Sequence, residues 1–352
     1  MDAASSTRER LAAWWALPAL IVAGLTAVGI AVRVVVVQDS LFADELSTYW
    51  IVSTNGLGGV ISTVHTNAEI TPPLYFVLAW LTTRLDVTAE LLRAPSFVAG
   101  IAAIPLTYVL GLRTVGRRAA LVATAITALA PFAIFYSTEA RGYELMVVLV
   151  MASTLAMLTA VDGGRARWWI AYAACSCAAV YTHYTAVFAL GAQLMWLLWA
   201  HPEARRPALL ANLAAVAAFA PWFSGLSADI NSPTTKILGE LEPFTFHTVR
   251  VVLGHWLIGY PLALSTLSDL PGNLALALLV LGVALAAFGL APTRLRRRPL
   301  RDRLRTRLTL IVLLLLSAPV GEAAFSLFGT DVFGTRNLAV SWPAFKIGRA
   351  HV

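Results

Sequence analysis

The sequence predicts an all-α polytopic membrane protein. Of its 352 residues, 59% are hydrophobic and 13% are charged, and the mean hydropathy is +0.74. A soluble domain carries about 25% charged residues. The apolar runs are rich in Leu and Ala, and many approach the roughly 20 residues that a helix needs to cross a bilayer. We therefore expect a helical bundle with about ten spans.

Apolar segments alternate with polar connectors along the chain. Two of them, 72–84 and 246–264, are short or mixed. A helix over 72–84 would be about 20 Å long, whereas the hydrocarbon core is about 30 Å thick. We therefore expect these two segments to lie at the membrane interface. The expected spans are 13–37, 94–112, 119–136, 143–161, 167–182, 184–200, 207–225, 272–291, 308–328 and one that begins at 337.

Arginine-rich connectors orient these spans, because cytoplasmic loops carry an excess of Lys and Arg. This bias explains the net charge of +7 without a nucleic-acid partner. The expected cytoplasmic segments are the N-terminus, 113–118, 162–167, 201–207 and 292–307. The expected external segments are 38–93, 137–142, 183, 226–271 and 329–336.

Two adjacent acids, Asp44 and Glu45, follow the first apolar run. Neighbouring residues on a helix or strand point in different directions. We expect one carboxylate to act as a base and the other to orient it, or to bind a cation or a hydroxyl. Alternatively, both are solvated loop residues. No metal site is predicted and no cofactor is certain, although a divalent cation is possible between the two acids.

The stretch HTNAEITPPLYF places His65, Glu69 and Tyr75 around a Pro-Pro pair. Proline is favoured at the first position of a helix, so a helix is expected to start here. A lone histidine is usually an interfacial residue. Because the Asp-Glu pair lies in the same external loop, a substrate-binding role gains weight for these three residues.

The stretch YSTEARGYEL places Glu139, Arg141 and Tyr143 in a tight external turn. An external arginine in a chain that places most of its arginine inside needs an anionic partner. That partner is either Glu139, in a structural ion pair, or a lipid phosphate, which Arg binds in bidentate fashion. Arg141 can also have both partners, if Glu139 orients its guanidinium toward the phosphate.

Two more polar residues are expected at external ends of spans. His183 lies in the turn YTHYTA, where it either binds substrate or caps and packs a helix. Arg336 lies in FGTRN, with the same choice between phosphate and ion pair as Arg141. Nucleotide-binding and Ser-His-Asp motifs are absent from the sequence, so nucleotide-driven chemistry is not supported.

The order of these motifs resembles that of the GT-C fold glycosyltransferases. A first span is followed by an external Asp-Glu, a His…Pro-Pro-Leu-Tyr segment, Arg-Ala-Pro-Ser before the next span, and Tyr-Ser-x-Glu-Ala-Arg-x-Tyr. The resemblance is to the family-39 group, which includes protein mannosyltransferases and aminoarabinose transferase-like enzymes. It extends over residues 13–200, and beyond 226 it is one of hydropathy alone.

The resemblance implies a polyprenyl-phosphate-sugar donor, an external active site and an inverting transfer. Asp44 takes the place of the proposed general base, and Glu45 that of the neighbouring acid. Thr71 precedes the prolines where aminoarabinose transferases carry a lysine and protein mannosyltransferases often a histidine, so the sugar and acceptor stay open. The other positions that match the family's site are His65, 72–75, Glu139, Arg141 and Tyr143.

We therefore predict a hexosyl- or pentosyltransferase that moves a sugar from a polyprenyl-phosphate-sugar donor to an acceptor hydroxyl. Such a reaction needs a carboxylate to take the hydroxyl proton and a cationic group to stabilise the leaving phosphate. The expected partners are the lipid donor, membrane lipids and a glycan, lipid or protein acceptor. The expected location is the plasma membrane, with a cytoplasmic N-terminus.

Two other classes of function remain open. A transporter or flippase of lipid-linked envelope intermediates would need polar groups within the spans, for which Arg33 and Glu322 are candidates. A non-catalytic assembly subunit would use the external acids only to solvate its loops.

The predicted organisation has five parts. Residues 1–12 form a cytoplasmic N-terminus, and 13–225 form a GT-C-like catalytic transmembrane module that contains the external loop 38–93. A second external loop with an interfacial helix covers 226–271, and further spans cover 272–345. The ending KIGRAHV contains IGRAHV, the translation of a common sequencing-library adapter. We therefore expect 346–352 to be an artefact and the natural chain to continue.

Overall fold

Helices joined by short turns make up the computed structural model, and the residues that it describes form no strand. It describes residues 2–42, 44–235, 237, 243–260, 298–329 and 333–351. The span expected at 272–291 lies outside these residues, as do parts of the expected loop 226–271 and connector 292–307. The α-helices are α1 (Asp2–Val36), α2 (Asp44–Thr54), α3 (Leu57–Thr63), α4 (Leu74–Thr82), α5 (Ala89–Thr114), α6 (Arg117–Leu129), α7 (Pro131–Ser137), α8 (Tyr143–Gly163), α9 (Ala166–Thr182), α10 (Ala186–Ala200), α11 (Arg205–Phe219), α12 (Phe223–Ile230), α14 (Phe246–Ile258), α16 (Arg298–Phe328) and α17 (Trp342–His351). The shorter helical turns are η1 (Val64–Ala68), η2 (Pro202–Ala204), η3 (Ala220–Trp222) and η4 (Asn337–Ser341).

The membrane-length helices lie where the apolar segments predict them. In the described part of the chain, five helical stretches are long and apolar enough to cross a membrane, or six if the bent pair α6–α7 is one span. The segments expected at 167–182 and 184–200 are helical, but α9 and α10 have only 17 and 15 residues. The five stretches are Leu17–Val36, Ala89–Thr114, Tyr143–Gly163, Pro202–Ile230 and Thr306–Phe328.

A bend of 56° between α6 and α7 explains the role of Arg33. Pro131 has no N–H and therefore interrupts the helical hydrogen bonds at this point. Arg33 of α1 donates hydrogen bonds to the carbonyls of Thr127 and Ala128 near this break, at 3.1 and 2.8 Å. It also donates to Ser137 Oγ at 2.8 Å. The buried Arg33 thus stabilises a broken helix.

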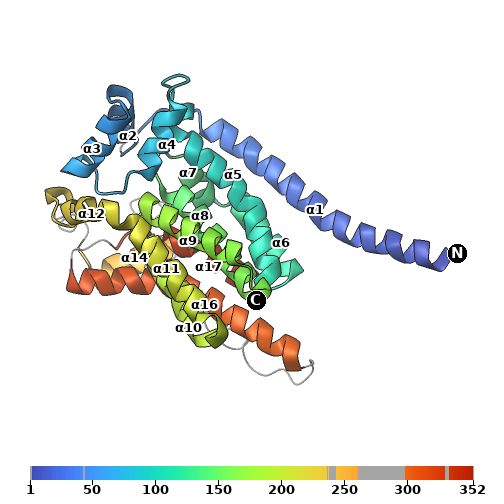
Figure 1. Ribbon diagram of the computed structural model, residues 1–352. Helices are drawn as coiled ribbons and strands as arrows, with labels where there is room; N and C mark the ends of the chain where they lie inside the picture. The colour runs from blue at the N-terminus through green and yellow to red at the C-terminus, as the bar shows by residue number, and fades with distance from the viewer. Residues whose placement is uncertain are drawn as a thin grey trace.

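The helices of the predicted external loop gather at one end of the bundle. Figure 1 shows α2, α3 and α4 together there, with α12 below them. α2 and α3 both contact α4, and α12 contacts η1. The segments expected to lie at the interface, 72–84 and 246–264, contain α4 and α14, with 9 and 13 residues. Neither helix has the length of a span, and their place at the membrane interface stays a prediction.

The arginine-rich connectors meet at the opposite end. Arg307 of α16 holds Asp162 of α8 through two hydrogen bonds of 2.7 Å and also donates to the Arg113 carbonyl. About 30 Å of helix separates this end of α8 from its first residue, Tyr143. The polar residues expected on opposite sides of a membrane therefore lie at opposite ends of the bundle.

Candidate functional site

A buried ion pair fixes the beginning of the first loop. The guanidinium of Arg93 binds both carboxylate oxygens of Glu45, at 2.7 and 2.6 Å. Glu45 is 1% exposed, and its carboxylate also accepts hydrogen bonds from the backbone N–H groups of Ala140 and Phe42. The sequence predicted a catalytic role for Glu45 next to Asp44. Its carboxylate is instead fully occupied within the protein, which favours a role in holding the loop.

Arg93 extends this attachment to the connector between α1 and α2. It donates hydrogen bonds to the carbonyls of Val37, Asp39 and Ser40, at 2.8, 2.6 and 3.1 Å. Sequence reasoning assigned no role to Arg93, although it lies in the Arg-Ala-Pro-Ser motif on the predicted external side. Its place outside the arginine-rich connectors was the available signal.

A second buried ion pair joins the first loop to the turn after α7. Arg141 binds the two oxygens of Glu69 at 2.8 and 2.9 Å, and Ser47 donates to Glu69 at 2.6 Å. Burial lowers the pKa of Arg141, but Glu69 outweighs this effect and raises the pKa above its ordinary value. The expected structural partner of Arg141 was Glu139. Glu69, which directly follows η1, takes that place.

The turn formed by residues 138–142 is held from several sides. Thr48 of α2 donates to the Ala140 carbonyl at 3.1 Å, and Ser96 of α5 donates to the Arg141 carbonyl at 2.8 Å. A Cβ added to Gly142 would lie 2.9 Å from Thr182 Cγ2 and 3.0 Å from the Thr182 carbonyl. Glycine therefore allows the turn to approach the end of α9.

A third ion pair differs from the first two because it is open. Arg336 Nη1 lies 3.0 Å from Asp44 Oδ2, and their side chains are 40% and 46% exposed. Interactions with Tyr143 and then Asp44 raise the pKa of Arg336, against the effect of burial. Asp44 and Arg336 stand 292 positions apart in sequence. Their pairing places the predicted base next to an arginine that a ligand can reach.

Glu139 lies within electrostatic reach of this open pair. It is 9% exposed, and its Oε2 atom is buried with no hydrogen-bond partner among the described residues. Burial raises its pKa to about 8, and the charges of Glu45 and Asp44 act in the same direction, against Arg141 and Arg336. The Glu139 carboxyl is therefore not the partner of either arginine.

Two neighbouring residues pack beside these charges. The rings of Tyr143 and His183 are 5.0 Å apart, and His183 Nδ1 lies 2.9 Å from Thr185 Oγ1. Burial, followed by Arg141 and Arg336, lowers the pKa of His183 to about 3. His183 follows the last residue of α9 as its cap. This placement favours the capping and packing alternative.

His65 and Tyr75 have partners other than the open pair. His65 Nε2 lies 3.0 Å from Ser224 Oγ, and its ring packs edge-on against Trp222. The buried Tyr75 hydroxyl donates to the Leu92 carbonyl at 3.1 Å and thereby fastens α4 to α5. These contacts explain both side chains structurally and assign neither a place in the open pair.

The possibility of a divalent cation between the adjacent acids stays a prediction. Among the described residues, no three His, Cys, Asp or Glu side chains are grouped so that they could hold a metal ion. Asp44 turns toward Arg336 while Glu45 turns toward Arg93. The two carboxylates thus face different partners, which gives the predicted cation no shared pair of ligands.

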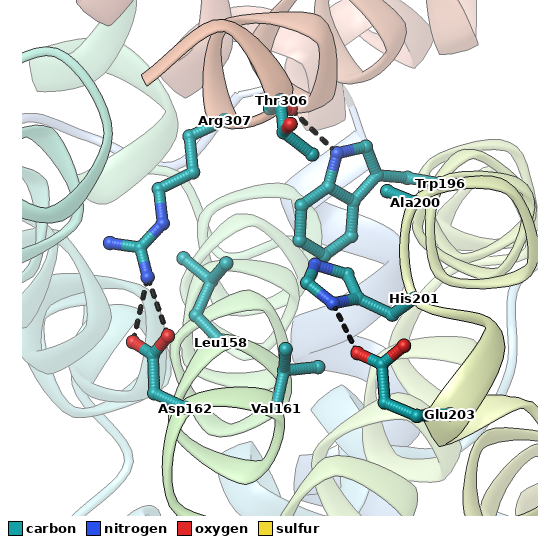
Figure 2. A pocket seen from close by; sticks show the side chains of 9 residues that line it. All are labelled: Leu158, Val161, Asp162, Trp196, Ala200, His201, Glu203, Thr306 and Arg307. Atoms are coloured by element: carbon teal, nitrogen blue, oxygen red, sulfur yellow. Dashed lines mark hydrogen bonds and ion pairs between the residues drawn. The ribbon is translucent and has the colours of Figure 1, made fainter. Parts of the chain in front are cut away.

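A pocket of about 220 Å³ lies at the other end of the bundle. Figure 2 shows Arg307 reaching Asp162 on one side, and His201 turned toward Glu203 on the other. In the same pocket, Trp196 donates its indole N–H to the Thr306 carbonyl at 2.7 Å. The polar side chains in this pocket are partnered with one another through the Arg307–Asp162 ion pair and the His201–Glu203 contact, which is the arrangement of a structural junction.

Comparison with known proteins supports the fold. A model of the dolichyl-phosphate-mannose-protein mannosyltransferase family matches residues 71–224. This match includes Glu139, Arg141 and His183 but begins after Asp44. A search of curated proteins finds no match.

Two solved structures share the arrangement of helices. ArnT from Cupriavidus metallidurans, bound to undecaprenyl phosphate, has a TM-score of 0.61 at 14% identity, covering 96% of this chain and 60% of ArnT. The oligosaccharyltransferase AglB from Archaeoglobus fulgidus, in complex with an inhibitory peptide and a dolichol-phosphate, has a TM-score of 0.53 at 13% identity, covering 95% and 50%. The chain thus spans 50 to 60% of the length of these proteins. It has the helical fold of the GT-C glycosyltransferases, is ArnT-like in structure, and over residues 71–224 is similar in sequence to the protein mannosyltransferases.

Proposed function

We propose that the protein is a membrane glycosyltransferase that transfers a sugar from a polyprenyl-phosphate-sugar donor to an acceptor hydroxyl with inversion. The observation that carries this proposal is the open pair of Asp44 and Arg336, which lies at one end of a GT-C fold. It combines an accessible carboxylate and an accessible guanidinium. These are the two groups that such a transfer requires.

In the proposed step, the acceptor oxygen forms a bond to the anomeric carbon while the bond from that carbon to the phosphate oxygen breaks. Asp44 takes the proton of the acceptor hydroxyl. The electron pair of the broken bond stays on the lipid phosphate, where Arg336 stabilises the charge that develops. A single displacement needs no protein nucleophile and inverts the anomeric centre.

The buried ion pairs support this step by positioning the loop. Glu45 lies next to Asp44 in sequence, and its attachment to Arg93 fixes the start of α2. Glu69 and Arg141 fix the turn that carries Glu139. Arg141 was predicted to bind the donor phosphate. Because Glu69 already occupies its guanidinium, we assign the phosphate contact to Arg336.

The finer features of the proposal rest on topology and resemblance. We propose that the site faces the outside of the plasma membrane, opposite the arginine-rich connectors and the cytoplasmic N-terminus. The transferred group is a hexose or a pentose, and the acceptor is a glycan, a lipid or a protein. The dolichol and undecaprenyl phosphates bound by AglB and ArnT support a polyprenyl-phosphate-linked donor.

The transporter alternative loses one of its two intramembrane candidates. Arg33 donates its hydrogen bonds to the broken α6–α7 helix and to its own helix, so it has a structural explanation. Glu322 remains buried in α16. This alternative keeps one of its two candidates, whereas the open pair supplies both groups that the transfer requires, so the geometry supports the enzyme best.

The proposal is tested by turnover in membranes that contain the protein. We would measure the loss of labelled sugar from a panel of polyprenyl-phosphate donors, supplied with candidate acceptors. Wild type would be compared with Asp44→Asn and Arg336→Ala at matched expression. The matched control is Asp162→Asn, which breaks an ion pair at the other end of the bundle.

We expect one donor to be consumed by wild type and by the control, but not by the two site variants. Consumption that survives Asp44→Asn in a folded protein would remove the base from the proposal. Absence of turnover with every donor and acceptor would contradict the enzyme itself.

A further inference from the structure

Glu139 is the one member of the turn 138–142 whose side chain the surrounding contacts do not explain. Ala140 is held through its N–H by Glu45 and through its carbonyl by Thr48. Arg141 is held through its side chain by Glu69 and through its carbonyl by Ser96. The backbone of the turn is therefore fixed, and with it the position of the Glu139 carboxyl.

The buried Oε2 atom of Glu139 has no hydrogen-bond partner among the described residues. A buried polar group without a partner destabilises the protein, because it has lost its hydrogen bonds to water. The two arginines nearby do not relieve this cost, because Arg141 is bound to Glu69 and Arg336 to Asp44. A carboxyl held in this way is suited to a partner that arrives with the substrate.

The groups that face Glu139 decide its charge. Arg141 belongs to the same turn, Asp44 and Glu45 belong to α2, and Arg336 precedes η4. Among the described residues, the other titratable neighbours are Tyr75 of α4, Tyr136 of α7 and Tyr143 of α8. Burial and the two acids favour the protonated form and outweigh the two arginines, so the pKa of Glu139 rises to about 8.

A protonated carboxyl offers one O–H donor, whereas an ionised one only accepts hydrogen bonds. Asp44 has the opposite environment, since it is exposed and paired with an arginine. Two carboxyls whose surroundings separate their charges take different roles in acid–base sites. Asp44 is the proposed base, and a protonated Glu139 needs an acceptor for its O–H.

We propose that Glu139 remains protonated and donates its O–H to an oxygen of the donor's lipid phosphate, beside Arg336. The inference rests on the proposed function and adds a second phosphate-binding residue to it. Glu139 keeps its proton throughout the transfer, and its hydrogen bond strengthens as charge develops on the leaving phosphate. A neutral Glu139 carboxyl also does not repel the phosphate, whereas an ionised carboxylate would.

The test measures binding of undecaprenyl phosphate alone, to the purified protein in lipid nanodiscs, between pH 7.5 and pH 9.5. The second pKa of a phosphate monoester is about 6, so the charge of the lipid is constant over this range. The variants are Glu139→Gln, which keeps a neutral donor of the same shape, and Glu139→Ala, which removes it. Glu203→Gln, an exposed acid at the other end, is the matched control.

We expect the dissociation constant of wild type and of Glu203→Gln to rise about tenfold for each pH unit above 8, because only the protonated carboxyl donates. Glu139→Gln should bind nearly as well as wild type at pH 7.5 and show no such rise. Glu139→Ala should bind about tenfold more weakly at pH 7.5. If the alanine variant does not fold, the profiles of wild type and Glu139→Gln still decide the matter.

Three results would overturn the inference. Equal pH profiles for wild type and Glu139→Gln would show that another group titrates, and would leave the proposed function intact. Tighter binding by wild type at high pH would indicate a carboxylate that recruits a cation. Absence of binding by wild type at every pH would contradict the proposed donor, and the role of Glu139 would fall with it.

Discussion

Asp44 and Glu45 are neighbours in sequence, yet the structure gives them opposite surroundings. Glu45 is closed inside the protein by Arg93, with 1% of its surface exposed, whereas the side chain of Asp44 is 46% exposed in its pair with Arg336. Both acids begin α2, where the helix N-terminus favours negative charge. Their difference comes from the direction in which successive helical residues point.

The comparison separates two uses of an ion pair. Removing one partner of a buried pair leaves an uncompensated charge, so the pair fixes the geometry of the chain around it. An exposed pair contributes only about 0–1 kcal/mol, so a ligand can replace one partner at little cost. The buried pairs Glu45–Arg93 and Glu69–Arg141 thus hold the loop, and the open pair is available to substrate.

Arg93→Met should produce the largest effect, because it removes the cation from the closed pair. The buried Glu45 carboxylate would lose its partner, at a cost of about 3–5 kcal/mol in the free energy of unfolding. Thermal or denaturant unfolding in detergent would measure it, with Arg307→Met at the opposite end as the control. The double variant Glu45→Gln with Arg93→Met should recover part of the loss. No recovery would mean that the backbone contacts of Arg93 matter more than its charge.

Asp44→Asn, in the open pair, should reduce activity strongly and stability only slightly, in contrast to Arg93→Met. We expect sugar transfer to fall by about 10²–10⁴-fold, since the base is lost. The free energy of unfolding should change by less than about 1 kcal/mol, because the pair is exposed. Initial rates and unfolding curves on the same preparation would check both numbers. A large loss of stability would show that the open pair is structural and would erase the distinction from Glu45.

Gly142→Ala tests whether the closed pairs keep the turn in place. The added methyl group would lie about 3 Å from Thr182, which is shorter than side-chain carbon atoms normally approach their neighbours. Relief of this overlap requires a shift of the turn, at about 1–3 kcal/mol. Unfolding measurements would give the cost, and Gly191→Ala, where the added methyl meets no atom within 4 Å, is the control. Equal costs for the two variants would show that the turn is loosely held.

The sequence predicted the helices and the two ends of the bundle because hydropathy and arginine position are properties of local segments. It also predicted that Asp44, Glu139, Arg141 and Arg336 face one end. The partners could not be predicted in the same way. Glu69 rather than Glu139 binds Arg141, and this pairing joins residues 72 positions apart, which no local pattern records.

Arg93 shows a different limit of the sequence. Its position outside the arginine-rich connectors marked it as unusual, but many acids lie in the same external segments. The choice of Glu45 over Asp44 depends on the rotation of α2 against α5. Adjacent carboxylates are equivalent in a motif and become distinct only once the helix that carries them is packed.

The smallest expected effect is a pH dependence of stability that comes from His183. It tests whether this buried group keeps the charge that its surroundings favour. Its pKa, lowered to about 3, means that the folded protein keeps it neutral while the unfolded chain takes up a proton below about pH 6.5. Stability should therefore fall as the pH drops below 6.5, by about 1 kcal/mol between pH 6.5 and 5.5. Unfolding of wild type and His183→Gln at both pH values would measure this, and the glutamine variant should lose that part of the dependence. An unchanged dependence would place the proton uptake elsewhere, whereas its loss would show that the His183 ring facing Arg141 and Arg336 stays neutral in the folded protein.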